Sequence, residues 1–405
     1  MVHAKATYPR IFPWNNDRDS EQIDRAQTIG GDLTINQTKL YEIGRNRKLG
    51  VHKETPSFAY SMTQFENGAM ALWRDLANIE DPASGALDES IDLDDIKSTF
   101  FDISAYLLDD NNTFRGTIWF PKLRVNGFSI NIADPDSIIE RSFDLIGEDY
   151  EIVTDNYFAF KKGTAVGSGP AEVTLSPVPI EWTSGDYVFR VLRVRGGVVT
   201  ELLEDAGAGA NTWAYNNGTK KVTVQTCVAS DVIKVYYPSA TAYTTLWTDN
   251  DVDAVAFYAD QCSIYLKVGV GVDTRIYRLQ SVGIDASFDR ADYKEVGNNE
   301  VVQTGVNAKT VTVSLGRILE DFTIEEILAG SPAYPYINAR DFSDEITLIV
   351  KIYTDNTKST FAIGYKITGL SPTTLSTGAN VEEYDTKDNA LESDNFLVTP
   401  DESEL

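Results

Sequence analysis

Apolar and polar residues alternate over many short segments of this chain, which is typical of β-strands with one buried face. Two clear examples, residues 57–62 and 310–315, each precede a stretch with helical spacing. In residues 63–77 the apolar side chains recur on one helical face, at Phe65, Ala69, Leu72, Trp73 and Leu76. The pattern predicts a mainly β fold that carries few helices.

The ends of the two helices are also predicted. Thr63 and Glu66 have the spacing of a capping box, and Asn78 suits a left-handed C-terminal turn. The second helix is expected to begin near Thr323, with Glu326 in its first turn, and to end at Gly330.

Residues 27–44 and 280–297 match without a gap. They share Gln, Gly, Glu and Gly at the same offsets, and their apolar positions alternate in step. The apolar pairs are Ile29 with Val282, Ile35 with Phe288, and Ile43 with Val296. A repeat of this kind predicts two copies of one structural unit.

The elements that follow recur in the same order. Each half continues with the strand and the helix, and then a hairpin, at residues 103–125 and 347–368. A final strand is expected at residues 149–153 and 394–398. Lys122 and Lys366 are assigned to equivalent places on the returning hairpin strands.

Between the copies, residues 157–248 predict a small antiparallel β domain, for which an immunoglobulin-like sandwich is one form. Its clearest hairpin runs over residues 213–224 and turns at 216–219. The predicted domains are residues 1–155 with an N-terminal arm at 1–20, the insert at 156–250, and residues 251–405 with a C-terminal tail from about 399. The predicted fold is thus two tandem β-sandwich or barrel domains, each with one helix, and an inserted β domain.

The chain carries a formal net charge of −26. Such a surface repels nucleic acid at long range and argues against a DNA-binding footprint. No stretch of 18 apolar residues occurs, and residues 1–12 lack the apolar run of a secretory signal. We therefore expect a protein made in a cytoplasm, with no membrane partner.

Residues suited to catalysis are few. His3 and His52 are the two histidines, and the two cysteines, Cys227 and Cys262, lie in strand-like segments as expected buried thiols. Phosphate-binding, nucleophile-elbow and dinucleotide motifs are missing. The sequence predicts no catalytic residue, no cofactor, no metal site and no enzyme activity.

An acidic segment beginning at Asp249 resembles part of a calcium loop. Asp249, Asp251 and Asp253 alternate, but Ala254 replaces the required glycine, and the final glutamate is missing. We interpret the segment, with Asp260 beyond it, as a solvated linker.

Several segments resemble tail tube proteins, the major tail proteins of tailed viruses. They are residues 277–282, 292–297 and 41–57, together with the order of strands, one helix and a hairpin. The resemblance implies hexameric rings whose inner sheets join into one barrel and stack into a tube. A chain with two copies would form a homotrimeric ring, in a virion tail assembled in the host cytoplasm.

The resemblance also implies partners: further copies of the chain, and tail proteins such as the tape measure, terminator and tip. Genomic DNA would pass through the lumen without specific binding. We expect a net negative lumen wall, formed by the hairpin strands 103–125 and 347–368. Lys122 and Lys366 should point away from it, toward carboxylates at an interface.

Three other functions fit the sequence. A tail-tip, hub or tail-terminator ring of the same fold would share these features. A non-viral carbohydrate-binding or adhesin-like β protein would need an exposed aromatic platform, with Trp182, Trp213 and Tyr215 as candidates. An acidic hydrolase could use paired carboxylates.

Overall fold

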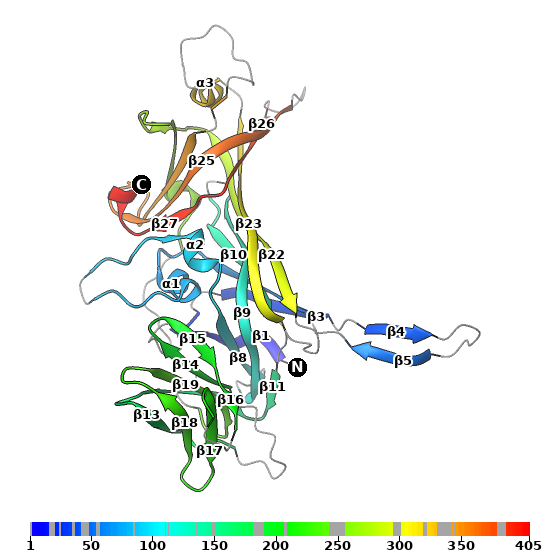
Figure 1. Cartoon of the computed structure of the whole chain (residues 1–405). Coiled ribbons are helices and arrows are strands. Elements are labelled where there is room, and N and C mark those ends of the chain that lie inside the picture. Colours follow the sequence, from blue (N-terminus) through cyan, green and yellow to red (C-terminus); the bar gives the residue numbers. More distant parts are fainter. Residues whose placement is uncertain are drawn as a thin grey trace.

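The chain is mainly β, as the sequence predicted. The structure, a computed structural model, describes residues 2–15, 21–23, 26–34, 37–41, 48–53, 57–83, 86–109, 111, 113–134, 136–147, 151–180, 190–205, 209–242, 256–294, 301–318, 322–329, 342–343, 345–378 and 386–405. The molecule is long, with β13–β18 near one end and α3 near the other (Figure 1).

The N-terminal part of the fold, called here the first unit, contains nine main elements. They are β1 (Val2–Pro13), β2 (Glu21–Gln22), β3 (Ala26–Thr34), β6 (Ser57–Phe65), α1 (Ala71–Ala77), β8 (Phe101–Asp109), β9 (Phe114–Ile132), β10 (Glu140–Gly147) and β11 (Glu151–Thr154). Four short elements lie between them: β4 (Gln37–Tyr41), β5 (Lys48–Lys53), β7 (Ile91–Asp92) and α2 (Leu93–Ile96).

The C-terminal part, called the second unit, has elements of the same kinds in the same order. They are β20 (Cys262–Val268), β21 (Thr274–Arg275), β22 (Leu279–Lys294), β23 (Val301–Ile318), α3 (Thr323–Leu328), β24 (Ile346–Tyr353), β25 (Phe361–Gly378), β26 (Thr386–Ser393) and β27 (Leu397–Thr399).

The two units pair their strands identically. The first unit forms the runs β2-β1-β8-β9-β11 and β3-β6-β10-β9. The second unit forms the runs β21-β20-β24-β25-β27 and β22-β23-β26-β25. Every pairing in both units is antiparallel. The predicted hairpins at 103–125 and 347–368 are present as β8·β9 and β24·β25.

The registers of the two units match as well. Met62 lies opposite Ile29 and Phe143, and the corresponding Leu315 lies opposite Val282 and Asn389. Since a shift by one residue would turn every side chain to the other face, equal registers mean that both units bury the same strand positions.

Each unit has one long strand that belongs to two sheets, β9 in the first and β25 in the second. Each strand turns at a residue of positive φ, Lys122 at 52° and Gly369 at 69°. Glycine adopts this backbone without strain. At Lys122 the backbone N–H donates to Oδ1 of buried Asp102 at 2.7 Å, which holds the corner.

These corners correct the predicted equivalence of Lys122 and Lys366. Phe120 lies opposite Ile103 in β8, and Ile367 lies opposite Leu348 in β24. Counting from these pairs, Lys122 corresponds to Gly369, and Lys366 corresponds to Trp119. The two lysines were aligned by residue type, whereas the backbone corner defines the true match.

Helix α1 begins later than predicted. Thr63 lies in β6, where its Oγ1 is 3.1 Å from Oγ of Ser142, and the helix starts at Ala71 without a side-chain cap. The predicted left-handed end at Asn78 is confirmed, with φ 55°. Helix α3 starts at Thr323 as predicted, and Gly330 lies outside the described residues.

The indole of Trp73, fully buried on α1, anchors this helix to the first unit. It makes edge-on contacts with Phe128 of β9 and Phe143 of β10, both at 5.1 Å between ring centroids. A buried indole contributes a large apolar area with defined geometry. Helix α1 therefore covers the core face of the sheet that contains β10.

The insert consists of β12 (Tyr157–Thr164), β13 (Gly169–Thr174), β14 (Arg190–Arg195), β15 (Val198–Glu201), β16 (Leu203–Glu204), β17 (Thr212–Asn216), β18 (Lys221–Cys227) and β19 (Val232–Ser239). Two four-stranded sheets, β12-β19-β14-β15 and β13-β18-β17-β16, enclose one apolar core. The predicted hairpin is present as β17·β18, and one pairing, β16·β17, is parallel.

An aromatic cluster attaches the insert to the first unit. Phe12 contacts Phe158 and Tyr236, with ring centroids 5.5 and 5.9 Å apart. The guanidinium of Arg190 lies 5.1 Å from the ring centroids of both Trp14 and Trp119. Buried residues of this cluster come from both the first unit and the insert, so the insert packs against β1 and β9.

A buried polar cluster ties the two units together. Arg141 of β10 donates from Nε to Gln64 at 2.8 Å and lies 3.3 Å from Oε2 of Glu66. Tyr365 of the second unit donates its hydroxyl to the same Glu66 oxygen. Both charged side chains are almost fully buried, so each depends on the other for compensation.

Replacing Arg141 with methionine should lower the free energy of unfolding by about 3–5 kcal/mol, because Glu66 would remain buried without its cation. The matched control is Arg115→Met, since Arg115 is exposed and pairs with Asp109 at the surface. Urea unfolding measures both variants. Equal stability of Arg141→Met and the control would contradict this account.

Candidate functional surface

The cysteine prediction is confirmed, since Cys227 and Cys262 are free and buried. Burial raises the pKa of the Cys262 thiol to about 12. His3 and His52 lie in β1 and β5, and their side chains fall outside the described residues. Of the acids in the segment interpreted as a solvated linker, Asp260 alone is described, and its Oδ2 accepts from Nδ2 of Asn356 at 2.7 Å.

The aromatic platform of the adhesin alternative is not present in the described part of the insert. Trp213 is 2% exposed and donates from Nε1 to the Leu202 carbonyl at 3.1 Å. Tyr215 packs partly buried against the same core. Trp182 lies outside the described residues.

The prediction that the hairpin strands at 103–125 and 347–368 line a lumen is wrong for β8 and β24. Every residue of β8 except Leu107 and Asp109 is buried, and every residue of β24 except Lys351 is buried. A strand buried on both faces cannot line a water-filled channel. The sequence prediction failed because the covering layer comes from residues far away along the chain.

A second surface is formed by one continuous sheet. Strands β3, β6, β10, β9, β22, β23, β26 and β25 pair in this order as one antiparallel sheet that runs through both units. Alternate positions of β6 and β10 are buried in the core, and the positions between them are exposed or half-buried.

The face opposite the core is small, polar and acidic, and is called here the acidic face. Its small residues include Thr28, Gly30, Thr34, Ser57, Ala59, Ser61, Ser129, Ser142, Ser281, Gly283, Ser287, Thr312, Ser314 and Ala390. Its acids are Asp32, Glu140, Asp144, Asp285, Asp289, Asp388 and Glu392. The half-buried Phe65 and Ile146 share this face, and none of the positions named is Lys or Arg, so the face carries negative charge.

The units meet at a backbone joint on this sheet. Residues 127–132 of β9 pair with residues 282–287 of β22, with Phe128 opposite Ala286 and Ile130 opposite Ile284. A second joint pairs β7 with β27. Phe396, which precedes β27, packs its ring 4.8 Å from that of Phe128, so the apolar cores are continuous.

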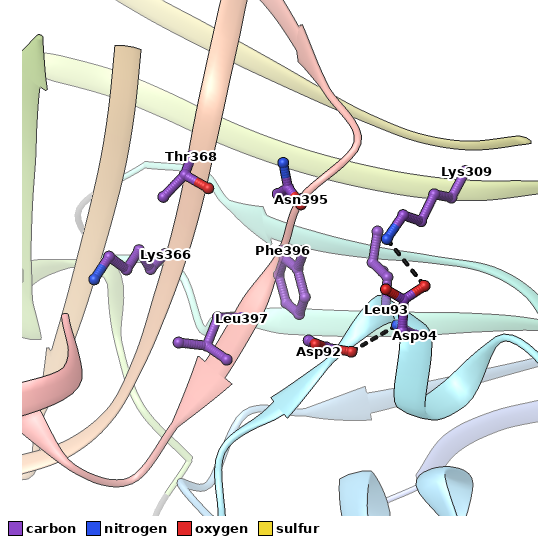
Figure 2. A pocket seen from close by; sticks show the side chains of 9 residues that line it. All are labelled: Asp92, Leu93, Asp94, Lys309, Lys366, Thr368, Asn395, Phe396 and Leu397. Carbon is purple, nitrogen blue, oxygen red and sulfur yellow. Dashed lines mark hydrogen bonds and ion pairs between the residues drawn. The ribbon is translucent and has the colours of Figure 1, made fainter. Parts of the chain in front are cut away.

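Figure 2 shows the pocket beside the second joint. It has a volume of about 240 Å³ and is lined by Asp92, Leu93, Asp94, Lys309, Lys366, Thr368, Asn395, Phe396 and Leu397. Nζ of Lys309 lies 3.0 Å from Oδ1 of Asp94, which links the two units by an ion pair. Lys366 was expected to pair with a carboxylate. Its Nζ donates instead to the backbone carbonyl of Glu404 at 2.7 Å.

Both ends of the sheet are open within the described residues. Strand β3 pairs with β6 on one side, and no described strand pairs with its other side. The C-terminal part of β25 likewise pairs with β26 alone. An open strand edge presents unpaired N–H and C=O groups, which is the usual template for adding another strand.

Two acids on the acidic face are close across the joint. Asp144 lies opposite Gly127, and Asp285 lies opposite Ser129, so they flank β9 two residues apart. Burial, followed by the negative charge of Asp144, raises the pKa of Asp285 above its usual range. The folded protein therefore loses part of its free energy of unfolding as the pH rises through the raised pKa of Asp285 and this carboxyl ionises.

No helix in the described ranges is long and apolar enough to cross a membrane. Nor do three or more His, Cys, Asp or Glu side chains gather in those ranges at a spacing that could hold a metal ion.

In an Asp144→Asn variant, the pKa of Asp285 should fall toward its ordinary value while burial still keeps it raised. The loss of stability as the pH rises through this pKa should become smaller. Carboxyl NMR titration measures the pKa, and Glu140→Gln is the control, since Glu140 lies on the same strand face. An unchanged Asp285 pKa in Asp144→Asn would show that Asp144 exerts no repulsion.

No family model and no curated protein matches this chain. Two solved structures are similar to part of it. One is the anti-feeding prophage cap, the tube terminating cap, at 11% identity and a TM-score of 0.29, which covers 39% of this chain and 100% of that chain. The other is from the anti-feeding prophage baseplate, at 11% identity and a TM-score of 0.25, which covers 34% of this chain and 91% of that chain. Both TM-scores are low, so neither similarity identifies a family.

Proposed function

We propose that this chain is a structural subunit of a viral tail tube, in which trimeric, pseudo-hexameric rings stack around a channel for DNA. One observation carries the proposal. The two units already join edge to edge into a single sheet, with their cores on one face and the acidic face on the other. A wall of a tube needs this division of faces.

The number of chains in the ring follows from the two units, which we propose to be copies of one ancestral domain. Their element order, strand pairings and registers agree, down to a β-bulge at the same place in β9 and β25. A head-to-tail contact either closes into a ring or continues as an open helix. Three chains with two units each would close a ring of pseudo-six-fold symmetry.

The acidic face would line the channel. Phosphate groups are repelled by carboxylates, and the binding of proteins to DNA depends on Lys and Arg contacts with phosphates. The positions named above for this face include seven acids and no Lys or Arg. DNA would pass along this wall without binding specifically to it.

Stacking of the rings would use a different part of the chain. Strands β4 and β5 pair with each other in a separate two-stranded sheet, and this hairpin extends away from the body (Figure 1). A hairpin alone is marginally stable in water, so contact with a neighbouring ring would stabilise it.

In this function the protein acts without catalysis or cofactor, in a virion tail assembled in the host cytoplasm. Its partners would be further copies of itself, the tape measure protein, and the terminator and tip proteins at the two ends of the tube. The insert would lie outside the channel, since it attaches through β1 and β9 at the aromatic cluster and not through the acidic face.

Purified protein should assemble into hollow rings, and the rings into tubes. Native mass measurement of single rings should give three times the chain mass of 44.8 kDa. Negative-stain images should show stacked rings with an open centre. Rings of six chains, or compact monomers at every concentration and salt tested, would contradict the proposal.

A further inference from the structure

We infer that neighbouring copies join by pairing β25 of one chain with β3 of the next, in the register of the joint inside each chain. The partner is thus a second copy, and its binding site is the pair of open strand edges. This inference rests on the proposed ring and adds to it the residues that meet.

The register follows from residues that correspond in the two units. Phe128 of β9 corresponds to Leu375 of β25, since Phe128 lies opposite Phe143 and Leu375 lies opposite the corresponding Asn389. By the same comparison, Ala286 of β22 corresponds to Leu33 of β3.

Applying the register of the internal joint to the open edges of β25 and β3 predicts which residues lie opposite each other between chains. Inside the chain, Gly127 lies opposite Ser287, and Ser129 lies opposite Asp285. Between chains, Thr374 should therefore lie opposite Thr34 of the next copy, and position 376 opposite Asp32. Thr34 and Asp32 are both exposed in the single chain.

The joint between chains brings like charges together, as the internal joint does. At the internal joint Asp285 faces the like charge of Asp144 across β9. Asp32 corresponds to Asp285, but Asp144 corresponds to Ala390 of β26 by the matched registers. In its place Asp388 of β26 lies opposite position 376, so Asp388 and Asp32 of the next copy would flank β25 as a carboxylate pair.

An exposed apolar side chain marks a second part of the same interface. Ile152 of β11 lies opposite Ile118, and the corresponding Val398 of β27 lies opposite Tyr365. Val398 also pairs with Ile91 across the internal joint and is fully buried, whereas Ile152 is 56% exposed. Ile152 therefore occupies the position that a neighbouring unit covers inside the chain.

The register can be tested by cysteine cross-linking in assembled protein. Thr374→Cys combined with Thr34→Cys should form a disulfide between chains under mild oxidation, because directly opposed residues have the required separation. The two positions lie on the outermost strands of one sheet, seven strand spacings or roughly 34 Å apart, so they cannot cross-link within a chain. The native cysteines are buried and should not compete.

Two controls define the result. Ser129→Cys with Asp285→Cys places a pair at the internal joint and should cross-link within each chain. Thr374→Cys with Gly30→Cys moves one member four residues along β3, and its yield should fall at least several-fold. On a denaturing gel the Thr374–Thr34 pair should convert the chain into a covalent trimer.

The possible outcomes separate this inference from the ring itself. Three-chain rings that cross-link better through Gly30 than through Thr34, or not at all, would overturn the register while leaving the ring in place. An unlimited ladder of cross-linked species would support the register and overturn ring closure. Monomers without cross-links would overturn both.

A second variant tests the interface without cysteines. Ile152→Asp should raise the protein concentration needed for half-maximal assembly by about tenfold, because a charge would be buried against the neighbour. Val178→Asp is the matched control, since Val178 is 53% exposed on the insert. Equal assembly of the two variants, with equal unfolding transitions, would overturn the role of Ile152.

Discussion

The hydrogen-bonding requirement of a strand edge governs this structure. Each β-strand has two edges, and an edge away from water must find a partner. Inside the chain, β9 and β22 satisfy each other at the joint between the units, and the sheet continues through both. Open edges remain at β3 and at the end of β25, where the described chain supplies no further strand. The strand pairing between the two units of one chain therefore provides a model for pairing between the open edges of neighbouring chains.

The second constraint is that a sheet has two faces. On one face, alternate residues enter a core shared by both units, together with Trp73 of α1 and Phe396. On the other face, the same strands carry small and acidic residues, and two of these acids are close enough for one to raise the pKa of the other. Tolerating this repulsion is consistent with a face selected for its negative charge, because uncharged Ser or Thr would fit there at lower electrostatic cost.

Much of the fold could be predicted from the sequence, because the side-chain period of a strand is two and the repeat preserves it. Residues such as Ile29 and Val282 could be matched by their place in this alternation, and both strands lie as expected. The acidic face also left a signal in the sequence. Positions 281, 283, 285, 287 and 289 are Ser, Gly, Asp, Ser and Asp, and they alternate with the buried residues Val282, Ile284, Ala286 and Phe288.

Other features depend on contacts that a single segment does not reveal. The spacing of Thr63 and Glu66 fits a helix cap, yet the strand continues to Phe65, and Glu66 is used for a buried pair with Arg141. The corner at Lys122 is held by Asp102 from a neighbouring strand, so no local glycine identifies it. The burial of β8 on both faces arises from packing between distant segments.

The most direct test of the central claim is a cryo-EM reconstruction of the assembled protein at a resolution that separates strands. The account predicts three chains around a channel, an inner wall that continues from β25 of each chain into β3 of the next, and the acidic face turned toward the lumen. An inner wall made from β8 and β24, or an acidic face turned outward, would contradict it.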